Sequence, residues 1–212
     1  MASKHHPLTR SPWGREYAQT PTTYIWGTAP SSFATEVTRL LPPRARVLDL
    51  GCGEGRDSVF FAAQGYDVTG VDISRAGLRK AERLGRERGV AVRWIQGDVA
   101  RLRLDGPFNL VYSCGSLHYV PRAWRPDLFR RLKTLTRPGG HHAHIVFTDR
   151  AIYVEKGEII DYFNPGELSG LYADWILLQR EDQMIACAQD GTPHRHSVEQ
   201  LVARAAGSRN TR

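Results

Sequence analysis

Cysteine and long apolar runs are scarce in this chain of 212 residues. Its three cysteines, Cys52, Cys114 and Cys187, are odd in number and widely spaced, so they match neither a disulfide framework nor a metal-site pattern. No apolar run approaches the length of a membrane span, and the N-terminal residues lack the apolar core of a signal peptide. We therefore expect a reducing, cytoplasmic location, no membrane contact and no bound metal.

The charge balance is basic, with a formal net charge of +7. Much of this charge lies in residues 75–88, where arginines and a lysine are interleaved with glutamates on one expected helix. Such a run is typical of a solvated outer helix face. Because no aromatic-rich RNA-binding signature accompanies it, we do not expect a nucleic-acid partner.

The length and the hydrophobic fraction of 41% suit one α/β domain and are short for two. We predict a single domain over residues 17–204, between flexible segments at 1–16 and 205–212. The polar, proline-containing stretch up to residue 21 is expected to be a loop. The oligomeric state is left open between monomer and homodimer.

One stretch, R-V-L-D-L-G-C-G-E-G-R at residues 46–56, organises the chain. Its apolar residues suit a buried parallel strand, and three alternate glycines follow at Gly51, Gly53 and Gly55. Glycines permit a sharp turn and the close approach of a ligand. A helical spacing of apolar residues then runs to Gly65. Strand, glycine turn and helix form the first half of a nucleotide-binding βαβ unit.

Periodicity and turn residues place the remaining elements. A helix begins at Ser31 or Ser32 and ends before a proline pair, and a second helix runs from a cap at Ser74 to about Arg88. The last two expected strands, separated by a long turn, predict an antiparallel hairpin. The expected strands after the first are residues 67–72, 90–95, 108–112, 142–148, 175–179 and 196–202.

The details of the glycine turn distinguish between ligands. A dinucleotide fingerprint would require glycine at the position of Arg56, and Asp49 would repel a pyrophosphate. A carboxylate at Asp49 suits a cationic ligand, and Asp72, at the tip of the second strand, can accept both hydroxyls of a ribose. As a set, Asp49, G-x-G-x-G and Asp72 resemble the class I S-adenosylmethionine-dependent methyltransferases.

Further motifs look like the tellurite-resistance and thiopurine methyltransferase branch of that class. They are G-C-G-E-G-R-D with Arg56, the upstream tyrosine–tryptophan segment, F-N-P-G-E-L, and the closing D-G-T-P-H-R-H. The resemblance implies a Rossmann-like, seven-stranded, mostly parallel sheet with helices on both faces and a C-terminal antiparallel hairpin. It also implies S-adenosyl-L-methionine as cofactor and S-adenosyl-L-homocysteine as product.

The expected reaction is methyl transfer, by in-line displacement, to a small-molecule acceptor: a thiol, a chalcogen or a natural-product nucleophile. Two alternatives from other classes remain open. One is a NAD-binding oxidoreductase on a Rossmann fold. The other is a protein that binds S-adenosylmethionine without catalysis or in contact with nucleic acid.

The resemblance and the strand ends together assign the candidate site. Asp98 corresponds to the family's acidic residue that meets the adenine amino group, and Cys114 follows the fourth strand, close to the cofactor by topology. We expect an aromatic lid at Tyr24 and Trp26, although bulky aromatics more often pack as an edge plug. The expected cofactor-binding residues are Tyr24, Trp26, Asp49, Gly51, Gly53, Gly55, Arg56, Asp72, Ile73, Asp98, Val99 and Cys114.

The acceptor is expected beside the same strand ends, with Tyr24, His118, Tyr119 and Arg150 as its binding residues. A thiol acceptor needs little more than deprotonation, because the thiolate is the reactive form. An oxygen or nitrogen acceptor needs a base, and His118 and His144 are the candidate catalytic residues. Each of these histidines is equally well read as structural.

Overall fold

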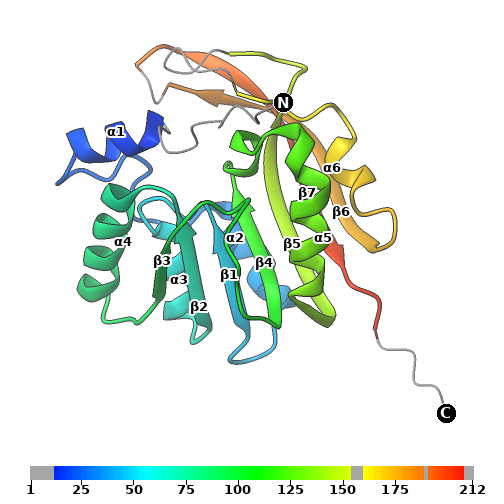
Figure 1. Cartoon of the computed structure of the whole chain (residues 1–212). Helices are drawn as coiled ribbons and strands as arrows, with labels where there is room; N and C mark the ends of the chain where they lie inside the picture. The colour runs from blue at the N-terminus through cyan, green and yellow to red at the C-terminus, as the bar shows by residue number, and fades with distance from the viewer. Residues whose placement is uncertain (1–11, 154–159, 189–190, 208–212) are drawn as a thin grey trace, which may run out of the picture.

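A seven-stranded sheet with the order β3-β2-β1-β4-β5-β7-β6 forms the centre of the molecule (Figure 1). The computed structural model describes residues 12–153, 160–188 and 191–207. Strands β1 to β5 pair in parallel, whereas β7 lies antiparallel to both of its neighbours, β5 and β6. This arrangement confirms the predicted fold class, including the closing antiparallel hairpin.

Two α-helices precede β1, helices and strands then alternate up to β5 except between β3 and β4, and α6 and the hairpin follow. The strands are β1 (Arg46–Leu50), β2 (Asp67–Asp72), β3 (Arg93–Gln96), β4 (Phe108–Cys114), β5 (Thr136–Thr148), β6 (Ile176–Cys187) and β7 (His194–Arg204). The α-helices are α1 (Pro12–Gln19), α2 (Ser32–Val37), α3 (Arg56–Ala63), α4 (Arg75–Glu87), α5 (Arg125–Thr134) and α6 (Glu167–Gly170). Short 3-10 helices are η2 (Thr38–Leu40), η3 (Leu117–Tyr119) and η4 (Arg122–Trp124).

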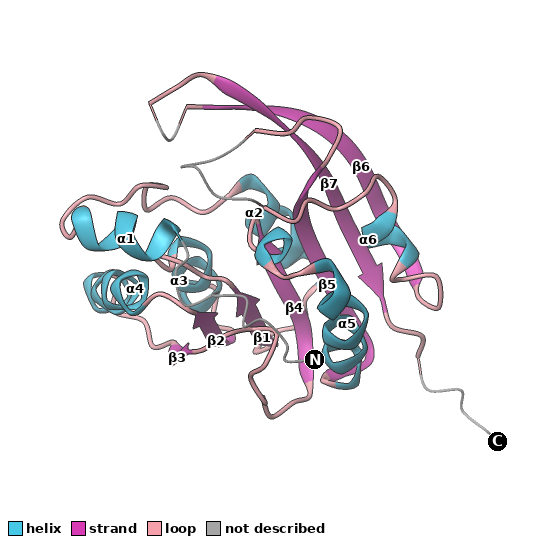
Figure 2. Ribbon diagram, turned by 45° about the horizontal axis from the view of Figure 1, so that its top comes forward, coloured by secondary structure: helices cyan, strands magenta, loops and turns pink. Residues whose placement is uncertain are grey.

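The central strands β1 and β4 are largely buried, as their continuous apolar runs require. Along β1, Val47 packs with α2 and α3 on one face, while Leu48 and Leu50 pack with α5 and α6 on the other. Figure 2 shows α5 and α6 beside the strands on one side of the molecule. The two cores fix the position of the strand ends, where the loops gather.

Two predicted helix caps are present. The side chain of Ser31 accepts a hydrogen bond from the Ala34 amide, and that of Ser74 accepts one from the Gly77 amide. Each cap satisfies an amide of the first helical turn that would otherwise lack a partner. The caps therefore start α2 and α4 at the residues that the sequence indicates.

The prediction of a loop before residue 21 is wrong for Pro12–Gln19, which form helix α1. Helix α1 packs mainly against α4, so its apolar face is short. The spacing of Trp13 and Tyr17, four residues apart on one helix face, is the signal that reveals it. The remainder of the two expected flexible segments, residues 1–11 and 208–212, lies outside the described residues.

Five strands differ in length from the prediction, and two of them, β4 and β7, are only a few residues longer than predicted. β3 begins only at Arg93, and β5 begins at Thr136, because a register shift in its pairing with β4 accommodates the proline and glycines that follow. β6 extends to Cys187 although nearly all of its residues are at least partly exposed. It is sustained by backbone pairing with β7, from Ile176↔Arg204 to Cys187↔His194, which an apolar pattern does not report.

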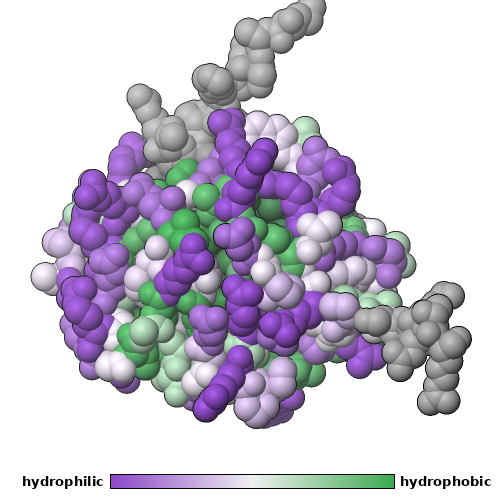
Figure 3. Space-filling view, turned by 60° about the horizontal axis from the view of Figure 1, so that its bottom comes forward, coloured by the Kyte–Doolittle hydropathy of each residue, from purple (hydrophilic) through white to green (hydrophobic). Residues whose placement is uncertain are grey.

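The β6–β7 hairpin extends past the ends of the other strands toward α1 (Figures 1 and 2). The face of the molecule seen in Figure 3 mixes hydrophilic side chains with smaller hydrophobic areas, as is usual for a surface in contact with water. Among the described residues, no helix is long and apolar enough to cross a membrane.

Arg125 at the start of α5 is a buried cation that joins three segments. Its side chain is 1% exposed, pairs with Glu167 at 2.8 Å and lies over the ring of Phe163. Its Nε donates to the carbonyl of Val120 at 3.1 Å. These contacts hold the loop after β4 against α6, and so they support one wall of the site described below.

We predict that Arg125→Ala destabilises the fold by about 3–5 kcal/mol, because it removes the buried partner of Glu167 Oε1 and leaves several carbonyls without their donor. Arg130→Ala, on the same helix with a side chain 70% exposed, is the matched control and should cost less than about 1 kcal/mol. Urea unfolding measures both. Equal small losses would contradict the role assigned to Arg125.

Candidate cofactor and acceptor site

A cavity of about 290 Å³ lies at the carboxyl ends of β1, β2 and β4. This is the edge at which open α/β sheets bind ligands. Its lining combines carboxylates and the glycine turn with apolar and aromatic side chains. Its lining side chains include Trp13, Tyr17, Trp26, Asp49, Glu54, Arg56, Asp57, Asp72, Ile73, Asp98, Val99, Cys114, Ser116, Tyr119, Val120, Ile145, Phe147 and Ile185.

The glycine turn after β1 forms the floor of the cavity. The amides of Gly51 and Cys52 both donate to the carbonyl of Val71, at 2.8 and 3.0 Å, so the turn is fastened to β2. Gly53 has φ +54°, and a Cβ there would lie 2.7 Å from the hydroxyl of Tyr17. Glycine is therefore required both by the backbone conformation and by the close approach of a side chain.

Asp72, at the tip of β2, accepts two backbone hydrogen bonds. Its two carboxylate oxygens receive the amides of Gly53 at 2.8 Å and of Ser74 at 2.7 Å. Burial raises the pKa of Asp72, and the two amides partly offset this rise. Each carboxylate oxygen can accept a further hydrogen bond, so Asp72 remains able to receive ligand hydroxyls.

Asp49, at the end of β1, lies among other carboxylates in a buried setting. Burial, together with the charges of Asp57 and Asp72, raises the pKa of Asp49 to about 7, although Ser58 Oγ donates to it at 2.6 Å. Asp57 itself accepts from Ser31 and from Tyr112. A cation placed in this part of the cavity would stabilise the ionised carboxylates.

Helix α1 and the segment after it cover the cavity; residues 12–30 are called the N-terminal lid below. Trp13 donates its indole N–H to the Tyr119 hydroxyl at 2.7 Å, which connects the lid to the loop after β4. The rings of Trp13 and Trp26 lie 5.2 Å apart. The aromatic roof therefore spans the cavity from α1 to η3.

A buried ion pair fastens the N-terminal lid to α4. Lys80 pairs with Glu54 and donates to the carbonyl of Thr23 at 2.6 Å. The second oxygen of Glu54 accepts the amide of Trp26 at 3.2 Å. Glu54 follows Gly53 directly, so the position of the lid is tied to that of the glycine turn.

Three comparisons with known proteins bear on this site. Residues 47–140 match the methyltransferase domain family. The chain is 39% identical over 98 residues to a ubiquinone biosynthesis O-methyltransferase of Ralstonia nicotianae, covering 45% of this chain and 40% of that protein. It is 27% identical over 155 residues to "Hemagglutinin 1" of Eikenella corrodens, covering 73% and 51%.

A relative is also found by both sequence and structure. TehB of Haemophilus influenzae, called a probable S-adenosyl-L-methionine-dependent methyltransferase, is 22% identical over 149 residues, covering 70% of this chain and 52% of that protein. Its crystal structure superimposes with a TM-score of 0.75 at 21% identity, covering 84% of this chain and 63% of that one. The chain spans about half the length of the curated relatives it matches.

Residues 47–140 thus match a methyltransferase domain, and the chain has the fold of the class I S-adenosylmethionine-dependent methyltransferases. The sheet order and the superposition on TehB confirm the predicted fold, the family match agrees with the predicted class, and S-adenosylmethionine is the cofactor of that class. These comparisons leave no support for the NAD-binding alternative.

The residues of this methyltransferase domain fit the cofactor. The sulfonium and the ammonium are cations, and the cavity offers them the buried carboxylates described above. The glycine turn leaves space that a Cβ would fill, and Asp72 presents acceptors for a ribose. When bound, S-adenosylmethionine supplies a methyl group that is already strongly electrophilic.

Most of the predicted site residues line the cavity. They are Trp26, Asp49, Gly51, Gly53, Gly55, Arg56, Asp72, Ile73, Asp98, Val99, Cys114 and Tyr119. Four others do not line it: Tyr24, His118, His144 and Arg150. The roles of the lining residues in binding stay proposals.

Neither of the two candidate bases, His118 and His144, lines the cavity. His144 is buried, with its two ring nitrogens engaged by Ser113 Oγ and the Tyr172 hydroxyl, both at 2.8 Å. Burial lowers the pKa of His144 to about 3. His118 is buried too, stacked on Phe147 at 4.1 Å, and burial lowers its pKa well below the ordinary value. Both histidines therefore lie outside the lining of the cavity, and a catalytic role for either stays a prediction.

The two remaining residues lie elsewhere. Tyr24 donates to the carbonyl of Lys80 at 3.1 Å and packs against α4, so it helps to dock the N-terminal lid without facing the cavity. Arg150 is exposed and pairs with Asp182 of β6 at 3.4 Å. Spacing along the sequence did not reveal either partner, since both contacts join distant segments.

Sequence reasoning missed several residues of the cavity wall. Trp13 lies on the unpredicted helix α1, and Ile185 lies beyond the predicted end of β6. Phe147 was placed on a strand, at the carboxyl end where ligands bind, so the topology alone could have assigned it. Glu54 belongs to the G-C-G-E-G-R-D motif, but the motif does not indicate that it anchors the lid.

The raised pKa of Asp49 predicts a pH-dependent affinity for S-adenosylhomocysteine, whose ammonium is a cation. The bound cation favours the ionised form, so the pKa of Asp49 falls on binding and ligand uptake releases a proton below pH 7. Affinity should be constant above about pH 8 and should decrease by up to about tenfold per unit as the pH falls below 7.

Isothermal titration calorimetry between pH 6 and pH 8 measures this dependence. Asp49→Asn is the matched variant, and its profile should be flatter because its side chain does not titrate. Affinity of the unaltered protein that stays constant over the range would contradict the assignment.

Proposed function

We propose that this chain transfers the methyl group of S-adenosylmethionine to a small acceptor: a thiol, a chalcogen or a natural-product nucleophile. The observation that carries the proposal is that one cavity is lined both by buried carboxylates and by apolar and aromatic side chains. The carboxylates suit the cationic cofactor, and the apolar and aromatic side chains suit a soft acceptor. The cavity volume lies near the lower end of the range for small-molecule sites, roughly 300–1,000 Å³.

The residues of the chain contribute alignment and exclusion of water. The glycine turn and Asp72 fix the position of the cofactor relative to β4, and Ser116 donates to the carbonyl of Leu50, which holds the loop beyond β4 against β1. The aromatic roof keeps water from the acceptor's lone pairs. Holding the reacting atoms in line is the main requirement for a displacement of this kind.

The placement of the histidines bears on the acceptor. No histidine is among the residues that line the cavity in the described part of the chain. A thiol or chalcogen acceptor ionises without a strong base, whereas an alcohol would need one. We therefore favour a soft acceptor, held as its anion or deprotonated by water. A cytoplasmic location and a monomeric or homodimeric state stay predictions.

The test begins with calorimetry of the tag-free protein with S-adenosylmethionine, S-adenosylhomocysteine and NADH. We expect binding of the first two and none of NADH. A screen of thiols, selenite, tellurite and phenols with a deuterium-labelled methyl donor then identifies products by mass spectrometry. Cofactor binding with no labelled product from any acceptor would favour the non-catalytic alternative. Binding of NADH alone would overturn the proposal.

The hydrogen bond from Trp13 to Tyr119 gives a prediction for the N-terminal lid. Trp13→Phe keeps an aromatic ring but loses the donor that joins the lid to the loop after β4. Because a neutral hydrogen bond contributes about 0.5–1.5 kcal/mol, turnover should fall roughly two- to tenfold with little change in melting temperature. Homocysteine release and thermal denaturation measure the two effects.

Trp124→Phe is the matched control, since Trp124 lies outside the cavity beneath Arg101. It should leave turnover unchanged. If Trp13→Phe turns over like the unaltered protein, the hydrogen bond does not hold the lid closed. If Trp13→Phe instead melts much earlier, the residue is a packed plug rather than a part of the lid.

A further inference from the structure

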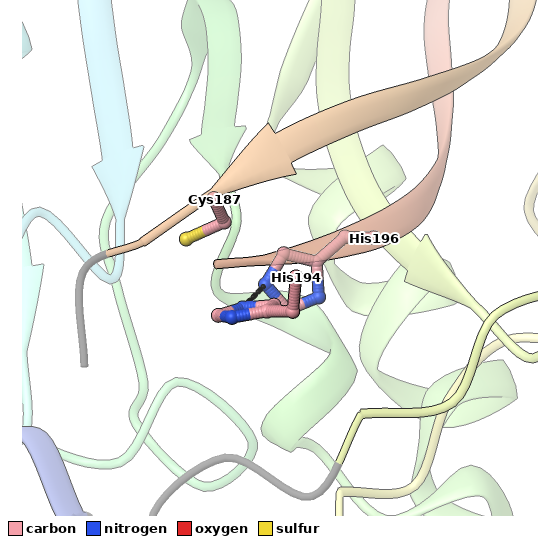
Figure 4. Close-up of side chains that lie close together, drawn as sticks. All are labelled: Cys187, His194 and His196. Atoms are coloured by element: carbon pink, nitrogen blue, oxygen red, sulfur yellow. Dashed lines mark hydrogen bonds between the residues drawn. The ribbon is translucent and has the colours of Figure 1, made fainter. Parts of the chain in front are cut away.

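Three potential metal ligands meet near the tip of the β6–β7 hairpin. The ligand atoms of Cys187, His194 and His196 all lie within 4.8 Å of one another, and Figure 4 shows the three side chains converging from the two strands. Cys187 pairs directly with His194 across the strands, and His196 follows two residues later on the same face of β7. The convergence therefore follows from the register of the hairpin.

The tautomer of His194 is fixed by its neighbours. Its Nδ1 lies 2.7 Å from the carbonyl oxygen of Thr192. A carbonyl can only accept, so Nδ1 carries the proton and Nε2 presents a lone pair. That lone pair points into the cluster, where His194 Nε2 lies 2.9 Å from His196 Nε2. A histidine whose second nitrogen donates to a backbone carbonyl is the usual arrangement of a metal ligand.

Aromatic packing holds both rings in this orientation. The ring of His194 stacks on Tyr153 at 3.6 Å, and that of His196 stacks on Phe147 at 4.2 Å. His196 is buried, with 1% of its surface exposed. The cluster therefore needs little side-chain ordering to close around an ion.

We propose that Cys187, His194 and His196 form a Zn²⁺ site. One thiolate and two imidazoles suit this borderline-soft ion, which accepts such a set in tetrahedral geometry. Three protein ligands leave a fourth position for water or another donor. Sequence analysis predicted no metal site, because the ligands are brought together by strand pairing and not by a short motif.

The proposed zinc site lies next to the wall of the cavity that contains Ile185 and Phe147. Ile185, which pairs with His196 across the strands, lines the cavity, and so does Phe147, on which His196 stacks. Zinc at the cluster would cross-link the two strands of the hairpin and so hold this wall of the cavity in place. Binding of Zn²⁺ by these three ligands does not depend on the identity of the methyl acceptor.

The test uses tag-free protein, reduced and treated with a chelator, and titrated with Zn²⁺ in competition with a chromogenic indicator. We expect one Zn²⁺ per chain, a higher melting temperature, and with Co²⁺ a tetrahedral d–d spectrum carrying a sulfur-to-cobalt charge-transfer band. Cys187→Ser should remove that band, and both Cys187→Ser and His194→Gln should weaken Zn²⁺ binding by more than ~100-fold.

Two control variants separate the site from adventitious binding. Cys114→Ser and His141→Gln alter residues outside the cluster and should keep both stoichiometry and affinity for Zn²⁺. Absence of stoichiometric binding, or unchanged affinity in Cys187→Ser, would overturn the proposal. Calorimetry with S-adenosylhomocysteine on the same zinc-free samples reports on the cofactor site, so failure of either assignment is seen separately.

Discussion

The hydrogen bonds that the amides of Gly53 and Ser74 donate to Asp72 are the constraint on which the site depends. One carboxylate joins the turn after β1 to the residue that caps α4. The glycine turn leads directly into α3. Glu54, the residue after Gly53, anchors the N-terminal lid through its ion pair with Lys80. The buried carboxylate of Asp72 therefore connects the ends of β1 and β2 with the starts of α3 and α4. Through Glu54 it also influences the position of the N-terminal lid.

That arrangement has an electrostatic cost. Burial raises the pKa of both Asp49 and Asp72, and at Asp49 the charges of Asp57 and Asp72 add to the rise. In a protein without a ligand, burial and neighbouring carboxylates thus oppose the ionised state of Asp49. The site is therefore organised for a cation, and the binding of one relieves a repulsion that the fold maintains. Functional sites are where such perturbed groups gather.

Much of this arrangement was accessible from the sequence, because the central features are local. The glycine turn, the Asp72 strand tip and the Ser74 cap are short patterns whose geometry follows from a few adjacent residues. The contacts that sequence analysis missed join distant segments: Trp13 to Tyr119, Glu54 to Lys80, and His144 to Tyr172.

The histidines illustrate the limit most clearly. His142 and His144 lie on one face of β5, as alternation along a strand requires, and both contact the Tyr172 hydroxyl. Which face looks toward the cavity depends on the helices packed there, and α5 and α6 cover the face that carries His144. Likewise, the length of β6 depends on pairing with β7, which no pattern within β6 records.

A crystal structure of the complex with S-adenosylhomocysteine tests the central claim most directly. The account predicts the ribose hydroxyls on Asp72, the adenine beside Asp98, and the amino-acid end over the glycine turn near Asp49. A ligand bound away from Asp72, with the Gly53 and Ser74 amides still occupying that carboxylate alone, would contradict it.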